Sequence, residues 1–200
     1  LGVSTLVEML NYNASDGTTD NTVLGPFFVA GSPERANGSS MLVDPDDGDR
    51  VVVRGRITDV DGNPLQGVVL DVWQNNTAGF YACQQPGIQS SENLRGIYRT
   101  DENGNYEIRT VRPVPYPIPF DGPVGALLKA NGRNWMRPGH LHFWLHHPGF
   151  KDLITHVFDV ESDYLNDDAV FGVRDSLICT FAPDASGELA TTFNFVLDRS

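Results

Sequence analysis

The chain has 200 residues and a formal net charge of -12, from 26 acidic and 14 basic residues. This length suffices for one domain with a sizeable core, and the acidic charge argues against nucleic acids and anionic membranes as partners. Two cysteines, Cys83 and Cys179, and the absence of an apolar run of transmembrane length predict a soluble, cytoplasmic protein. Three Asn-x-Ser/Thr sequons, which begin at Asn13, Asn37 and Asn75, leave secretion open as an alternative.

The sequence of residues 1–48 predicts the remnant of a helix followed by an extended arm. Residues 49–200 are expected to form a second unit. After residue 13 the composition shifts to Gly, Ser, Asn, Asp and Pro, which disfavour regular elements. Only the run at residues 22–28 is apolar, and its phenylalanines need a core to bury against. We therefore expect the arm to lie across the second unit. The predicted helix rests on four apolar residues at helical spacing, namely Val3, Leu6, Val7 and Leu10.

Residues 49–200 show the period-two alternation that is typical of β-strands, beginning with Val51, Val53 and Ile57. A turn at residues 61–64 would join the first two strands into a hairpin, and a turn at residues 101–104 would join the next two. Many short strands with turn signals between them predict a mainly β fold, an antiparallel β-sandwich. We expect one short helix at residues 124–130 and further strands at residues 68–74, 96–100, 105–110, 139–145, 153–160, 176–181 and 190–197.

His140 and His142 share one face of the predicted strand at residues 139–145, because successive side chains of a strand alternate between faces. Neutral imidazoles are the commonest metal ligands. A lone His-x-His pair is about as typical of a polar surface, but the rigid entry after Arg137 and the apolar neighbours favour a metal site. Dinuclear hydrolases and cupin-like ferrous sites do not fit, because residues 144–147 (WLHH) offer no carboxylate.

Tyr81 and Tyr116 are candidates for the missing ligands. Tyr81 follows the predicted strand at residues 68–74, and Tyr116 lies in a proline-dense loop at residues 112–123, whose stiff backbone holds the ring outward. Either ring alone is more simply explained by packing at the edge of the sandwich. With the two histidines, however, they form a set of two phenols and two imidazoles, and phenolate is a hard anionic donor that favours ferric iron.

The motifs in this chain resemble those of the intradiol ring-cleavage dioxygenases, the catechol 1,2-dioxygenase family, over almost the whole sequence. The first motif, the last motif and residues 155–158 (THVF) look most like the hydroxyquinol 1,2-dioxygenase branch of that family. The matching runs are TVLGPFF at residues 22–28, DVWQ at 71–74, GFY at 79–81, TDENGNYEIRT at 100–110, YPIPFDGPVG at 116–125, RPGHLHF at 137–143 and DAVFGV at 168–173.

The resemblance implies one Fe(III) ion per subunit, bound by Tyr81, Tyr116, His140 and His142. It also implies two catalytic residues. Arg137 would lie beside the substrate and stabilise negative charge, and Tyr116 would leave the metal when the substrate binds and accept one of its protons. The substrate-binding residues that the resemblance implies are Val23, Pro26, Phe27, Arg137, His156, Ala169 and Val170.

The implied reaction inserts O2 between the two adjacent hydroxyl-bearing carbons of hydroxyquinol (benzene-1,2,4-triol) and gives 3-hydroxy-cis,cis-muconate, the enol of maleylacetate. Catechol or chlorocatechol, cleaved to cis,cis-muconates, is the alternative substrate class. A non-catalytic, transthyretin-like binding or scaffold sandwich is an alternative of another class, because residues 55–64 follow that pattern in outline. A scaffold would leave the combination of two tyrosines, two histidines and an arginine unexplained.

The partners that the resemblance implies are a small aromatic diol, O2 and a second copy of the chain. Members of the family form homodimers through N-terminal helices that precede the equivalent of Leu1. We therefore expect a homodimer, and we expect this chain to be a fragment from which those helices are largely missing.

Overall fold

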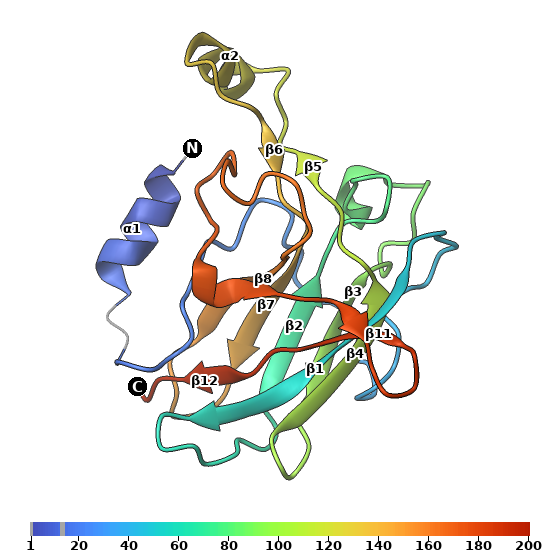
Figure 1. Ribbon diagram of the computed structural model, residues 1–200, viewed down its shortest axis with the longest axis vertical. Helices are drawn as coiled ribbons and strands as arrows, with labels where there is room; N and C mark the ends of the chain where they lie inside the picture. The colour runs from blue at the N-terminus through green and yellow to red at the C-terminus, as the bar shows by residue number, and fades with distance from the viewer. Residues whose placement is uncertain (1, 13–14) are drawn as a thin grey trace.

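The computed structural model describes residues 2–12 and 15–200 and shows two packed five-stranded sheets (Figure 1). The predicted mainly β sandwich is therefore confirmed. The first sheet has the order β10 (Ala182–Pro183), β11 (Leu189–Thr192), β1 (Arg50–Asp59) and β12 (Phe195–Leu197), with β4 (Asn105–Val111) paired to β1. The second sheet has the order β3 (Arg95–Arg99), β2 (Val69–Trp73), β7 (His140–His146), β8 (Leu153–Asp159) and β9 (Ile178–Cys179).

The alternation of side chains along β7 gives this strand two buried faces. Leu141, Phe143 and Leu145 belong to the core between the two sheets. His140 and His142 alternate with them and point to the outer face of the second sheet, where they are nevertheless buried. A second, smaller apolar cluster covers that outer face, and it contains Trp73, Tyr81 and Tyr116 together with Leu24, Phe27, Phe28 and Trp144.

Both predicted hairpins are wrong. Among the described residues, β1 pairs with β4, β11 and β12, whereas β2 pairs with β3 and β7. The chain therefore crosses from one sheet to the other after β1 and again between β3 and β4. The turn residues at 61–64 and 101–104 do reverse the chain, but a turn signal does not specify which strand the next one will pair with.

Two predicted strands differ in detail. Residues 176–181 begin in a 3-10 helix, η2 (Asp175–Leu177), before the two-residue β9. Residues 190–197 are divided into β11 and β12 by a break at residues 193 and 194, where Phe193 N still donates to Arg54 O of β1 at 2.8 Å. The carbonyl oxygen of Phe193 would lie 1.8 Å from a Cβ atom at position 55, so only Gly55 fits there. Both β11 and β12 run parallel to β1, as β9 does to β8.

The arm and both helices lie outside the two sheets. Backbone hydrogen bonds attach the arm to both sheets. Thr22 N donates to Ile154 O of the second sheet at 2.7 Å, and Met41 N donates to Arg109 O of the first sheet at 2.8 Å. Helix α1 (Val3–Asn11) forms as predicted, although its apolar residues are exposed. Helix α2 (Pro123–Ala130) stands at the end of an excursion that leaves the sandwich through the ribbon of β5 (Tyr116–Pro117) and β6 (Met136–Arg137) (Figure 1). A short 3-10 helix, η1 (Ala82–Gln84), follows Tyr81.

Among the described residues, no helix combines the length and the apolar character that crossing a membrane requires. Of the three sequons, the one at Asn75 has a buried side chain that donates a hydrogen bond to Val114 O at 3.0 Å, so this asparagine is unsuited to glycosylation in the folded chain. Asn37 is exposed, and Asn13 lies outside the described residues.

Candidate metal centre

The four predicted ligands meet on the outer face of the second sheet. His140 and His142 come from β7, Tyr116 comes from β5, and Tyr81 directly precedes η1. The Nε2 atoms of the two histidines lie 3.2 Å apart, and Tyr81 Oη lies 3.0 Å from His142 Nε2. The rings of Tyr81 and Tyr116 meet edge to face, with centroids 5.2 Å apart. Two phenol oxygens and two imidazole nitrogens therefore surround one buried position.

The surroundings of His140 and His142 favour the neutral form that binds metals. Burial, followed by the positive charge of Arg137, lowers the pKa of both imidazoles well below the usual value of 6.5. His140 Nδ1 lies 2.6 Å from Pro138 O, to which it donates its proton, so Nε2 of a neutral His140 carries the lone pair. Trp73 stacks on His142 with ring centroids 4.7 Å apart. These contacts orient both imidazoles before any metal binds.

The phenol of Tyr81 is protonated until a cation is present. Burial and the neighbouring Tyr116 raise the pKa of Tyr81 well above its usual value of 10.0. Phe27 stacks on the Tyr81 ring, with centroids 4.7 Å apart, and keeps water from the phenol. A metal ion beside Tyr81 would reverse this effect, because its charge favours the phenolate.

Arg137 is buried beside the donor atoms, with only 3% of its surface exposed. Its Nη1 atom lies 3.2 Å from His140 Nε2 and 3.5 Å from Tyr116 Oη. Burial disfavours the charged guanidinium, but the phenol of Tyr116 and the carboxylate of Asp168 outweigh burial and raise the pKa of Arg137 above its usual value. A permanent positive charge therefore stands next to the position that the four donors surround.

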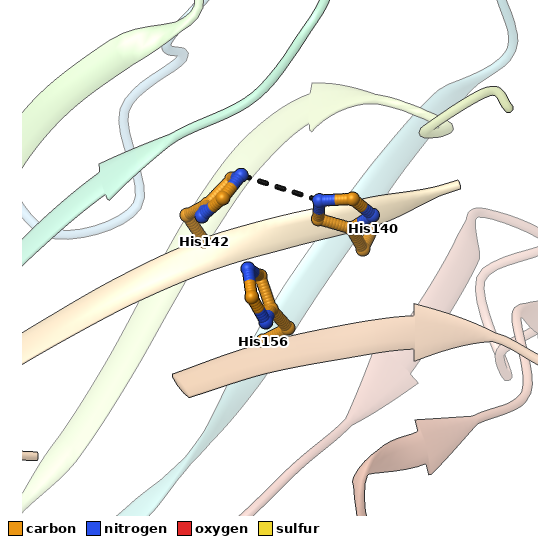
Figure 2. A group of neighbouring side chains, drawn as sticks. All are labelled: His140, His142 and His156. Atoms are coloured by element: carbon orange, nitrogen blue, oxygen red, sulfur yellow. Dashed lines mark hydrogen bonds between the residues drawn. The ribbon is translucent and has the colours of Figure 1, made fainter. Parts of the chain in front are cut away.

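His156 joins the two histidines of β7 in a cluster of three buried imidazoles (Figure 2). It lies opposite His142 in the β7–β8 pairing, and its ring centroid is 4.3 Å from that of His142 and 4.7 Å from that of His140. His156 Nδ1 is hydrogen-bonded to Thr22 Oγ1 at 2.6 Å, whereas its Nε2 atom has no partner among the described residues. The family resemblance implies that His156 binds the substrate, whereas in the structure His156 lies beside the candidate metal ligands His140 and His142.

A cavity of about 620 Å³ opens beside Tyr116 and Arg137. Its size is in the usual range for a small-molecule site. Of the residues predicted to form the pocket, Ala169 is fully buried and does not line the cavity, and neither does His156. The predicted residues that do line it are Val23, Pro26, Phe27, Arg137 and Val170.

The structure adds residues to the site that the sequence reasoning missed. Thr5 and Glu8 of α1 also line the cavity, and Asp168 pairs with the buried Arg137. A buried arginine needs a carboxylate partner, and Asp168 begins the motif at residues 168–173, so the sequence contained a partial signal for it. No feature of α1 in the sequence indicates that it faces the cavity.

Comparison with known proteins gives consistent matches along the chain. The family model described as Dioxygenase matches residues 23–199. The chain is 47% identical to the hydroxyquinol 1,2-dioxygenase of Rhizobium sp., over 98% of this chain and 66% of that protein. It is 43% identical to the catechol 1,2-dioxygenase of Candida albicans, over 90% of this chain and 60% of that protein. The crystal structure of hydroxyquinol 1,2-dioxygenase from Pseudomonas putida superposes with a TM-score of 0.94 at 42% identity, over 100% of this chain and 73% of that one.

The chain spans about two thirds of the length of the curated relatives that it matches. The matched family implies an iron site, and the buried residues fit one, because phenol oxygens and imidazole nitrogens are suitable ligands of iron. The four donor atoms make their polar contacts only with one another and with Arg137 among the described residues, so they converge on one position. The family model covers the arm from residue 23, both sheets and every candidate ligand. This chain belongs to the intradiol ring-cleavage dioxygenase family.

Proposed function

We propose that this chain is the catalytic part of an intradiol dioxygenase that uses one Fe(III) ion, bound by Tyr81, Tyr116, His140 and His142, and that cleaves hydroxyquinol. The observation that carries the proposal is the convergence of these four donors beside the buried guanidinium of Arg137, at the edge of a cavity of about 620 Å³. A non-catalytic scaffold would gain nothing from two phenols and two neutral imidazoles gathered at one buried position.

A ferric ion held by these donors supplies the Lewis acidity that makes a bound diol reactive toward O2. Tyr116 lines the cavity, so that its phenolate could accept a proton from an incoming diol. Arg137 cannot act as that base because its guanidinium stays charged, and it stabilises negative charge on the diol instead. Phe27 and Val170 supply apolar walls that exclude water and hold the aromatic ring.

Two observations favour hydroxyquinol as the substrate. The relatives matched over most of this chain include hydroxyquinol 1,2-dioxygenases, among them a solved structure. In addition, α1 brings the polar side chains of Thr5 and Glu8 to the cavity, where they can bond to the third hydroxyl group, which catechol lacks. The expected product is 3-hydroxy-cis,cis-muconate.

Cleavage of catechol or chlorocatechol to cis,cis-muconates is the second candidate function. It is supported by the 43% identity to a catechol 1,2-dioxygenase and by the largely apolar wall of Val23, Pro26 and Phe27. The two functions differ in whether the polar groups of α1 contribute to binding.

The visible absorption spectrum of the iron-loaded protein tests both the ligands and the substrate. We expect a broad phenolate-to-iron band that shifts when a diol is added without O2, and that shifts at a lower concentration of hydroxyquinol than of catechol. Consumption of O2 and formation of the muconate should follow when air is admitted. If catechol shifts the band at a lower concentration than hydroxyquinol does, cleavage of catechol becomes the favoured function.

Two tyrosine variants sharpen this measurement. Tyr81→Phe removes one proposed ligand and should displace and weaken the band, whereas Tyr98→Phe alters a buried tyrosine of the core that bonds to Ser39 O and should leave the band unchanged. A colourless protein with bound iron, or equal spectra for the two variants, would contradict the proposed ligand set.

A further inference from the structure

The carboxylate of Asp168 holds the guanidinium of Arg137 on the side away from the candidate metal ligands. Arg137 Nε lies 3.1 Å from Asp168 Oδ1, and Arg137 Nη2 lies 3.3 Å from Asp168 Oδ2. Both side chains are almost completely buried, with 4% and 2% of their surfaces exposed. This two-point pairing fixes the plane of the guanidinium and leaves Nη1 directed at Tyr116 Oη and His140 Nε2.

The same carboxylate also holds the loop that follows it. Its oxygens accept hydrogen bonds from Gly172 N at 2.8 Å and from Val170 N at 3.3 Å. A Cβ atom at position 172 would lie 3.0 Å from Arg137 Nη2 and 3.1 Å from Asp168 Oδ2, so the loop is packed closely against the ion pair and a side chain there would displace it by a few tenths of an ångström. The loop in turn places Val170 in the wall of the cavity.

Two further contacts fix this loop from outside. Ala169 N donates to Met136 O at 3.0 Å, which ties the loop to the residue that precedes Arg137. Thr5 Oγ1 of α1 donates to Val170 O at 2.8 Å. The position of Val170 and the direction of the Arg137 side chain therefore depend on the same few contacts, with Asp168 common to both.

An arginine side chain has several rotatable bonds, and a buried one without a carboxylate would turn toward whichever anion is nearest. At this site the other groups within reach of the guanidinium are His140 Nε2 and Tyr116 Oη, and both residues are proposed metal ligands. We propose that Asp168 is a positioning residue that acts through Arg137: it directs Nη1 at the substrate side of the metal centre and sets the cavity wall at Val170. This inference rests on the proposed function, since it assigns Arg137 a role in diol cleavage.

Three variants separate positioning from stability: Asp168→Asn, Arg137→Gln and the double variant. Each single change leaves one buried charge unpaired, whereas the double variant removes both charges and so protects folding. We expect Asp168→Asn to keep its iron and its visible band without substrate, and to lose about tenfold to hundredfold in kcat and in kcat/KM together. In kcat, the double variant should match Arg137→Gln within about twofold, because Asp168 affects turnover through Arg137, whereas a displaced wall at Val170 would appear in KM.

Asp59→Asn is the matched control. Asp59 is also buried, accepts backbone hydrogen bonds from Asp61 N and Asn63 N, and pairs with Arg199 Nη2 at 2.7 Å. It ends β1, at the end of the sandwich opposite the ribbon of β5 and β6 (Figure 1). This variant should lower the unfolding midpoint but leave kcat per bound iron unchanged.

A second readout requires no turnover. In the iron-free protein, the guanidinium signals of Arg137 in 15N–1H NMR spectra can be assigned by their loss in Arg137→Gln. We expect separate, slowly rotating Nη signals in the wild type and in Asp59→Asn, and merged signals in Asp168→Asn, because the two-point pairing is gone.

Unchanged kcat in Asp168→Asn, unchanged guanidinium signals, or a double variant in which the two losses multiply would each overturn the proposal. If Asp168→Asn does not fold, the comparison of the double variant with Arg137→Gln still tests whether Asp168 acts through Arg137. A wild-type protein that binds iron but cleaves no diol would instead contradict the proposed function, and the NMR signals would then decide the positioning role alone.

Discussion

His140, His142 and His156 show how burial sets the chemistry of single residues in this chain. All three imidazoles are buried on one face of the second sheet, and burial is the largest cause of their lowered pKa values. The spacing of His140 and His142 was enough to predict that they share a face. The place of His156 beside them follows from the pairing of β7 with β8, which depends on tertiary structure and not on a local pattern.

These three histidines predict a pH-dependent stability of the iron-free protein. They stay neutral in the folded chain but titrate near pH 6.5 when unfolded, so below that pH the unfolded chain binds more protons. The free energy of unfolding should therefore rise with pH between about 5.5 and about 7, by about 1 kcal/mol per pH unit for each histidine. Urea unfolding at several pH values measures this slope.

His156→Gln should remove about one third of that slope, because one of the three imidazoles is gone. A flat profile would show that the cluster takes up protons without unfolding.

At the scale of elements, the strands were predictable where period-two alternation was clear, as in β1, β4, β7 and β8. The partition of strands between the two sheets was not predictable, because turn residues report only that the chain reverses. The elements that carry the proposed metal ligands also approach one another closely. The backbone of Gly139, next to β7, packs against the carbonyl group of Pro113, at the start of the loop that carries Tyr116.

This close approach predicts the effect of a single methyl group. A Cβ atom at position 139 would lie 2.5 Å from Pro113 O, so Gly139→Ala should push the Tyr116 loop away from His140. We expect a loss of about 1–3 kcal/mol in unfolding free energy and weaker iron binding, measured by urea unfolding and by iron titration. Gly122→Ala, at a position with no neighbour within 4 Å, should cost less than about 1 kcal/mol. Equal stability of the two variants would show that the loop yields without strain.

At the scale of the whole molecule, the cavity is assembled from segments that lie far apart in the sequence. The arm contributes Phe27, the β5–β6 ribbon contributes Tyr116 and Arg137, and α1 contributes Thr5. Most of these residues could be predicted from the sequence, because each of them lies in a short motif that is recognisable without the fold. That α1 faces the cavity required the folded chain, because its apolar spacing predicted only that it is a helix.

The homodimer stays a prediction, and α1 is the element on which to test it. We expect sedimentation velocity to show self-association that increases with concentration, because a helix with this much exposed apolar surface favours burial. Leu6→Lys with Leu10→Lys should weaken the association, whereas Ile88→Lys, at an exposed loop residue, should not. A monomer at all concentrations would contradict the prediction. The exposed apolar residues of α1 are Val3, Leu6, Val7, Met9 and Leu10.

The two buried faces of β7 bear on how the protein matures in the cell. The core between the sheets contains Leu141, Phe143 and Leu145 but none of the four proposed ligands, so we expect the sandwich to fold without iron. Insertion of the proposed iron would then be the last step of biogenesis, and a chain that had lost the metal would stay folded. When iron is scarce, such a protein would accumulate as a stable apoprotein and recover by reloading, without new synthesis.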